Sequence, residues 1–177
     1  MGKRAAVKKP VRLHSGASKF FVAEIFTDAS AWGWGAVSIW EGRVVSTASH
    51  PWTPEERMNW RVESSVVAEP LAVVKAVAKF LPARRAECPA GVRIWSDHLP
   101  LVFAAARGVG KAFAYSHMLS ALSHREGYFF CFGFVAGENN PADPFSRGRT
   151  LQHTPPLLPV TRIGRMMRWE GEREAKG

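Results

Sequence analysis

Apolar residues along the chain change their spacing several times between residues 20 and 150. Runs that are rich in β-branched and aromatic residues, as strands are, stand at 21–26, 33–37, 91–96 and 128–135. Between residues 66 and 81 the apolar residues instead recur at every third or fourth position, which predicts an amphipathic helix. Strand-forming runs and helical segments alternate along the whole chain in the order β-β-β-α-β-α-α-β-α, which predicts an α/β fold in which helices flank a mixed sheet.

The length of 177 residues and the 46% share of hydrophobic residues suit one domain with a core. We expect this domain at 20–150, after a basic arm at 1–19 and before a proline-rich connector and charged tail at 151–177. The arm has no acidic residue and few large apolar ones, so we expect it to be disordered. It fits a nonspecific tether to nucleic acid, a nuclear-entry signal, a mitochondrial presequence or a linker, and the sequence does not separate these.

Two further features bear on compartment. No apolar run approaches the roughly 20 residues that span a bilayer, so we expect no membrane partner. Cys88 and Cys131 lack the paired spacing of a zinc site and allow one disulfide at most. We therefore expect an intracellular protein of the cytoplasm or nucleus, with mitochondrial targeting left open by the arm.

The net charge of +9 is distributed unevenly. Residues 1–19 hold six Lys/Arg and no acid, whereas residues 20–150 hold 13 Lys/Arg and 12 Asp/Glu. If four acids of the central region are taken into a metal site, 13 basic side chains face eight acidic ones there. That excess is enough for a basic surface that attracts nucleic acid.

Four carboxylates stand where the predicted elements begin or end. Asp28 follows the first strand and precedes a turn of small residues, and Asp97 ends the run at 91–96. Asp143 lies just past the strand at 128–135, at the junction of a loop with a helix. Side chains held at strand ends are rigid enough to fix a metal ion.

The fourth carboxylate belongs to the helix at 66–80, and two residues compete for the role. Glu69 lies near the start of that helix, and Glu63 stands six residues upstream. Pro70 complicates the choice, because a helix accepts proline best in its first turn and a kink here could displace Glu69. We favour Glu69 and keep Glu63 as the alternative.

Four acids in these positions indicate one divalent-metal site that cleaves a nucleic acid backbone. In-line phosphodiester hydrolysis needs a deprotonated water and a stabilised leaving oxygen, and two hard cations about 4 Å apart can supply both. Carboxylate oxygens are the ligands that Mg²⁺ prefers, and Mn²⁺ accepts the same set. Without metal such acids repel one another and hold protons to a higher pH than usual, so metal affinity should weaken on acidification.

The same motifs, in the same order, resemble those of the ribonuclease H family. They are Thr27-Asp28-Ala29-Ser30 with Gly33-Trp34-Gly35-Ala36, then Glu69-Pro70-Leu71-Ala72, then Ser96-Asp97, and finally the run from Gly137 to Arg147. The resemblance covers roughly residues 20–149. It is greatest to the versions fused to reverse transcriptases in retrotransposons, including DIRS-like elements.

This resemblance implies a ribonuclease H-like fold with a mixed five-stranded sheet, and cleavage of the RNA strand of RNA-DNA hybrids with two Mg²⁺ ions. It implies that Asp28, Glu69, Asp97 and Asp143 are both the catalytic residues and the metal ligands. It supports Glu69 over Glu63, because only Glu69 begins a Glu-x-x-Ala signature. The implied partners are an RNA-DNA hybrid and a reverse transcriptase domain in the same polyprotein, to which the arm would be a linker.

The chain also departs from the family pattern. His98 replaces the Asn that often follows the third acid, and Phe134-Val135-Ala136 occupies the stretch where many cellular members carry a His. The second departure bears on product release more than on the chemical step. Pro70 and the missing His favour one alternative, a noncatalytic nucleic-acid-binding module of the same fold. A DNA-cutting transposase or integrase relative, which would share the metal chemistry, is the other alternative that stays open.

Several polar and aromatic residues are candidates for contact with nucleic acid. Ser30, Asn139 and Asn140 could reach sugar or phosphate oxygens, and Arg147 could bind a phosphate. Further phosphate candidates are Arg107, Lys111 and Arg149, for each of which a solvated surface position is the competing interpretation. Tryptophans could stack on bases or pack in the core, and those concerned are Trp32, Trp34, Trp52 and Trp60.

Overall fold

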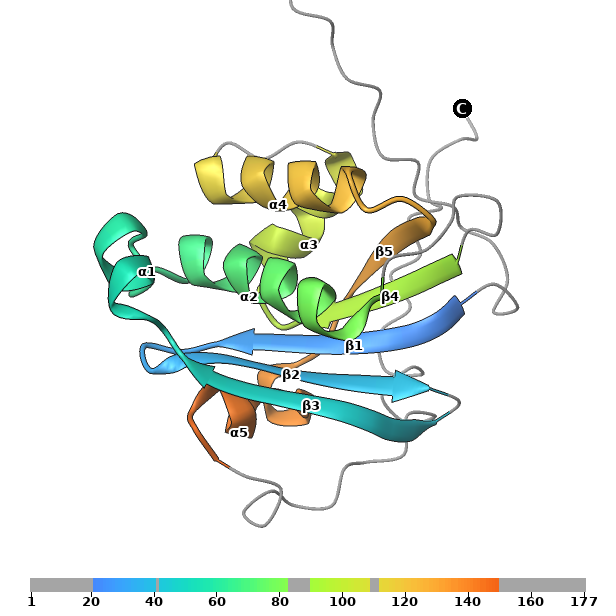
Figure 1. Cartoon of the computed structure of the whole chain (residues 1–177), viewed down its shortest axis with the longest axis horizontal. Helices are drawn as coiled ribbons and strands as arrows, with labels where there is room; N and C mark the ends of the chain where they lie inside the picture. The colour runs from blue at the N-terminus through green and yellow to red at the C-terminus, as the bar shows by residue number, and fades with distance from the viewer. Residues whose placement is uncertain (1–20, 41, 83–89, 109–111, 150–177) are drawn as a thin grey trace, which may run out of the picture.

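The computed structural model describes residues 21–149 apart from 41, 83–89 and 109–111 (Figure 1). The strands are β1 (Phe21–Ala29), β2 (Gly33–Trp40), β3 (Arg43–Pro51), β4 (Ala90–Ser96) and β5 (Tyr128–Phe134). The helices are α1 (Pro54–Asn59), α2 (Ser65–Phe80), α3 (Leu99–Arg107), α4 (Phe113–Ser123) and α5 (Asp143–Ser146), with a 3₁₀ turn, η2, at Gly137–Asn139. The arm, the tail, Cys88 and Lys111 lie outside the described residues.

The five strands form one sheet in the order β3-β2-β1-β4-β5. The pairs β1–β2 and β2–β3 are antiparallel, whereas β1–β4 and β4–β5 are parallel. The sheet is therefore mixed and five-stranded, which confirms the predicted fold class. Since β1 and β4 are neighbouring parallel strands, their carboxyl ends meet at the same edge of the sheet.

Helices cover both faces of this sheet, with α2, α3 and α4 on one face and α5 on the other (Figure 1). Successive residues of β1 serve the two faces, as strand geometry requires. Ile25 packs in the core cluster under α2 and α4, whereas Phe26 packs with Phe145 of α5 in the second cluster. No helix within the described residues is long and apolar enough to cross a membrane.

One helix in the structure was not predicted. The sequence pattern gave one helix between the third and fourth strands, but α1 precedes α2 there. Thr53 caps α1 with a capping box, in which its side chain accepts a hydrogen bond from the Glu56 backbone while the Glu56 side chain accepts one from the Thr53 backbone. Pro54 follows as the first helical residue, so the Thr-Pro-x-Glu signal was present in the sequence.

Pro70 stands inside α2, which begins five residues earlier, at Ser65. Its missing N–H can remove only one backbone hydrogen bond of the helix, the one that would go to the Val66 carbonyl. The proline is buried, and the helix continues through it to Phe80. Pro70 therefore does not displace Glu69, whose side chain still reaches the strand ends.

Candidate metal centre

Asp28 and Asp97 meet because β1 and β4 run side by side. Phe26 of β1 is paired with Trp95 of β4, and each acid comes two residues after its member of that pair. Asp28 is 4% exposed, and Asp97 is half-buried just past the end of β4. The sheet register alone thus brings two carboxylates to one edge.

Glu69 reaches the same edge from α2, which packs on β1. The side chain is 5% exposed, and its Oε1 accepts a hydrogen bond of 3.3 Å from the Ala29 backbone at the end of β1. Glu63 is exposed and precedes α2. Among the described residues the structure thus brings Glu69, and not Glu63, into the acidic group.

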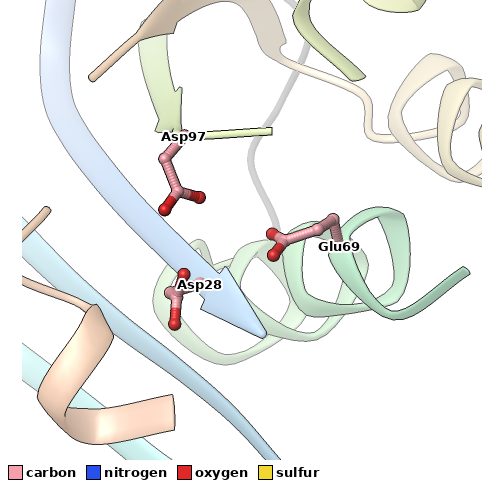
Figure 2. A group of neighbouring side chains, drawn as sticks. All are labelled: Asp28, Glu69 and Asp97. Carbon is pink, nitrogen blue, oxygen red and sulfur yellow. The ribbon is translucent and has the colours of Figure 1, made fainter. Parts of the chain in front are cut away.

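Asp28, Glu69 and Asp97 form a compact group in which one carboxylate oxygen of each lies within 4.8 Å of the others. Figure 2 shows the three side chains reaching one space from β1, α2 and the end of β4. Asp28 Oδ2 and Glu69 Oε2 are buried and have no hydrogen-bond partner among the residues that the structure describes. Buried carboxylate oxygens without partners are costly, so the group fits a bound hard cation that such oxygens would ligate.

The electrostatics of the group follow from burial and from mutual repulsion. Burial raises the pKa of Asp28 to about 7, with the charges of Asp97 and Asp143 adding to the rise and a hydrogen bond from Ser146 opposing it. Burial raises the pKa of Glu69 to about 9, and the charges of Asp28 and Asp97 contribute further. Burial also raises the pKa of Asp97. Metal-free protein at neutral pH therefore holds protons in this group.

Asp143, the fourth predicted acid, is the first residue of α5 and is not a member of the three-acid group. Its Oδ1 accepts hydrogen bonds from Arg147 Nε at 3.0 Å and from Arg147 Nη2 at 2.9 Å. Its charge still raises the pKa values of Asp28 and Asp97, so it lies within electrostatic reach of them. The structure thus places the fourth acid beside the group but pairs it with Arg147.

A glycine allows α5 to lie this close to the sheet. Gly35 of β2 is the partner of Asp28 in β1, and a Cβ on Gly35 would lie 2.2 Å from the Ser146 backbone nitrogen. No side chain fits in that space, so the glycine lets α5 pack directly on β2 beside Asp28. At Gly137 a Cβ would lie 3.0 Å from Asp97 Oδ2, so a side chain there would press on that carboxylate.

The candidates for nucleic-acid contact differ in their burial and in the hydrogen bonds that they make within the protein. Asn140 is 4% exposed, donates from Nδ2 to the Thr27 carbonyl at 3.0 Å and accepts from the Ala142 backbone at 3.1 Å. These bonds suit Asn140 to holding the loop before Asp143 against β1. Ser30 donates to the Ser146 carbonyl at 2.6 Å, so it holds α5 as well. Asn139 is half-buried in η2.

The arginine and tryptophan candidates divide in the same way. Arg107, Arg147 and Arg149 are exposed. Trp34 and Trp52 are 5% and 3% exposed and belong to the core, whereas Trp32 is 39% exposed and Trp60 is half-buried. The Trp52 indole donates to the Ser30 carbonyl at 2.9 Å, which supports the turn after Asp28.

His98 and Tyr115 form a contact that was not predicted from the sequence. His98 Nε2 lies 3.0 Å from the Tyr115 hydroxyl, which joins the residue after Asp97 to α4. Burial lowers the pKa of His98, and burial together with the charge of Glu69 raises the pKa of Tyr115. Tyr115 thus lies within electrostatic reach of Glu69. No sequence signal announces the contact of His98 with Tyr115, since the two residues are 17 positions apart.

Solved structures with the same fold are known. The N-terminal RNase H domain of Rv2228c from Mycobacterium tuberculosis, solved as a fusion with maltose-binding protein, is 14% identical with a TM-score of 0.54, and the match covers 72% of this chain and 97% of that one. LC11-RNase H1, solved in complex with an RNA/DNA hybrid, is 17% identical with a TM-score of 0.50, and the match covers 72% and 94%. The chain therefore has a ribonuclease H-like α/β fold. No protein-family model matches the sequence, and no curated protein sequence matches it.

Proposed function

We propose that this protein is a metal-dependent endoribonuclease that hydrolyses the RNA strand of RNA-DNA hybrids. The observation that carries the proposal is the group of three carboxylates, Asp28, Glu69 and Asp97, whose oxygens lie within 4.8 Å of one another at the strand edge of a ribonuclease H-like fold. Buried oxygens without partners in Asp28 and Glu69 suit this group to a cation. LC11-RNase H1, which shares the fold, was solved with an RNA/DNA hybrid bound, and this supports the choice of substrate.

In this proposal Asp28, Glu69, Asp97 and Asp143 hold two Mg²⁺ ions, which Mn²⁺ can replace. The ions would supply an activated water and a stabilised leaving oxygen. The protein's own contribution is rigidity and a low dielectric. Asp28 and Asp97 are fixed by two paired strands, and Glu69 is fixed by its hydrogen bond from Ala29. The metal-free group holds protons, so these acids must release them before they can serve as ligands.

The nucleic-acid contacts in this proposal come from residues around the acids. Of the four candidates Ser30, Asn139, Asn140 and Arg147, Arg147 is the most accessible, because its side chain is 55% exposed. Ser30 and Asn140 would act mainly by holding α5 and its loop, as their hydrogen bonds indicate. Recognition of the RNA strand would use its 2′-hydroxyl groups.

A reverse transcriptase domain in the same polyprotein is the partner that the retrotransposon-like motifs suggest, and it belongs to the proposal as well.

The main alternative is a noncatalytic nucleic-acid-binding module. One reason for that alternative was that Pro70 could displace Glu69. Glu69 nevertheless lies with Asp28 and Asp97 in the three-acid group, so this reason no longer applies. The other reason, Phe134-Val135-Ala136 in place of a loop His, bears on product release.

A matched pair of variants tests the proposed site. Glu69→Gln keeps the shape of the side chain but removes a ligand charge, and Glu63→Gln makes the same change at an exposed position outside the group. We expect Glu69→Gln to lose hybrid cleavage by a factor of at least about 100 and Glu63→Gln to keep it. Equal cleavage by the two variants, each shown to be folded, would remove Glu69 from the site.

A further inference from the structure

The ion pair between Asp143 and Arg147 occupies the carboxylate of a proposed ligand for the second metal ion. Asp143 is the only one of the four proposed ligands for which the described part of the chain shows a cationic partner. The pair is made of two hydrogen bonds to a single carboxylate oxygen, Oδ1. The other three acids already converge. The free protein thus offers a formed three-acid site and a fourth acid held to one side.

The backbone that carries this pair is fixed. Ser30 Oγ donates to the Ser146 carbonyl at 2.6 Å, and Ser49 Oγ donates to the Phe145 carbonyl at 2.6 Å. These bonds join α5 to the β1–β2 turn and to β3, in addition to the close contact at Gly35. Freeing the Asp143 carboxylate therefore needs only rotation of side chains, without movement of the helix.

The pair is also weak and open to ligands. The side chains of Arg147 and Asp143 are 55% and 35% exposed, and the two residues are four positions apart. Ion pairs of this kind change an equilibrium by about twofold. A phosphate competes well for such an arginine, since a guanidinium can bind two phosphate oxygens at once.

We propose that Arg147 holds Asp143 away from the metal site in the free protein and exchanges it for a phosphate of the bound nucleic acid, so that bound substrate strengthens binding of the second ion. This inference rests on the proposed function. Both halves of the exchange concern the same site, because the charges of Asp143 and Arg147 already act on Asp28 and Asp97. By linkage, ion binding and hybrid binding then strengthen each other.

The first test is calorimetric titration of Mn²⁺ into the full chain without substrate. We expect a tight ion and a weaker one, with Arg147→Gln tightening the weaker one by about two- to threefold and the tight one by less. Arg43→Gln is the control: it makes the same charge change at the far end of the sheet, where Arg43 pairs with Trp40. Asp143→Asn should lose the weaker ion, and adding Arg147→Gln to it should change nothing more.

The second test is binding of an RNA-DNA hybrid in EDTA, followed by fluorescence anisotropy over a range of salt concentrations. Arg147→Gln should weaken binding and lower the salt slope by about one, whereas Arg43→Gln should not. The inference is wrong if Arg147→Gln matches Arg43→Gln in either test while the native chain binds two ions and cleaves hybrid. A native chain that binds no Mn²⁺ would overturn the proposed function together with the inference.

Discussion

Replacing Asp28 by Asn should stabilise the metal-free protein at alkaline pH. Burial raises the pKa of Asp28 from 3.8 to about 7, so between these values the folded protein holds a proton that the unfolded chain has released. Stability therefore falls as pH rises through this window, and the loss is complete above the folded-state pKa. Three pK units correspond to roughly 4 kcal/mol, an upper limit that relaxation of the site reduces.

Urea unfolding of the native chain and of Asp28→Asn, in EDTA at pH 4.5 and pH 8, measures this effect. We expect similar stabilities at pH 4.5, because the native acid is then mostly protonated in the folded state. At pH 8 the variant should be more stable by several kcal/mol. Adding Mg²⁺ or Mn²⁺ at pH 8 should stabilise the native chain far more than the variant, since the variant has lost a ligand.

Glu63→Gln serves as the control, because it removes an acid that is exposed and lies outside the group. The Glu63→Gln variant should be no more stable than the native chain at pH 8 without metal. If Asp28→Asn were equal to or less stable than the native chain at pH 8 without metal, Asp28 would not be a desolvated acid. The reasoning from burial to metal binding would then fail at its first step.

Three further predictions follow from the same geometry. Gly35→Ala should cost about 3 kcal/mol in urea unfolding, because the new Cβ would meet the α5 backbone at Ser146, and unchanged stability would show that α5 can move away. Metal loading at pH 7.5 should release about one proton or more per chain, because the pKa of Glu69 is about 9. Calorimetry in two buffers of different ionisation enthalpy measures the number of protons released, and no release would contradict the shifted pKa. Tyr115→Phe removes the hydroxyl that meets His98 and should lower stability by about 1 kcal/mol, whereas an unchanged unfolding midpoint would mean that the contact contributes nothing.

The strand acids could be predicted from sequence because each directly follows a run of strand-forming residues. Asp28 and Asp97 end neighbouring parallel strands, and the order of elements was sufficient to put such strands in one sheet. Glu69 needed a second signal, the Glu-x-x-Ala signature, since helical periodicity alone did not separate it from Glu63. Sheet type and helical cover followed from hydrophobic spacing, which reports directly on burial.

Side-chain hydrogen bonds between residues far apart in the chain, or within a short helix that the sequence did not delimit, could not be predicted. The bond of Arg147 to Asp143 needs a helical turn at residues 143–146, and the sequence showed only that a loop meets a helix there. The sequence suggested that the Asn140 amide contacts nucleic acid. In the structure Asn140 is buried and donates a hydrogen bond to the carbonyl of Thr27, 113 positions away in the chain. Such contacts depend on three-dimensional packing, to which local sequence patterns are insensitive.

Cleavage of an end-labelled RNA-DNA hybrid, beside duplex DNA, duplex RNA and single-stranded RNA, decides whether this protein is the proposed endoribonuclease. Each substrate is incubated with the full chain in Mg²⁺, in Mn²⁺ and in EDTA. We expect cutting of the RNA strand of the hybrid alone, with either metal and not in EDTA. Hybrid binding without cutting by folded, metal-loaded protein would contradict it and would favour the noncatalytic nucleic-acid-binding module.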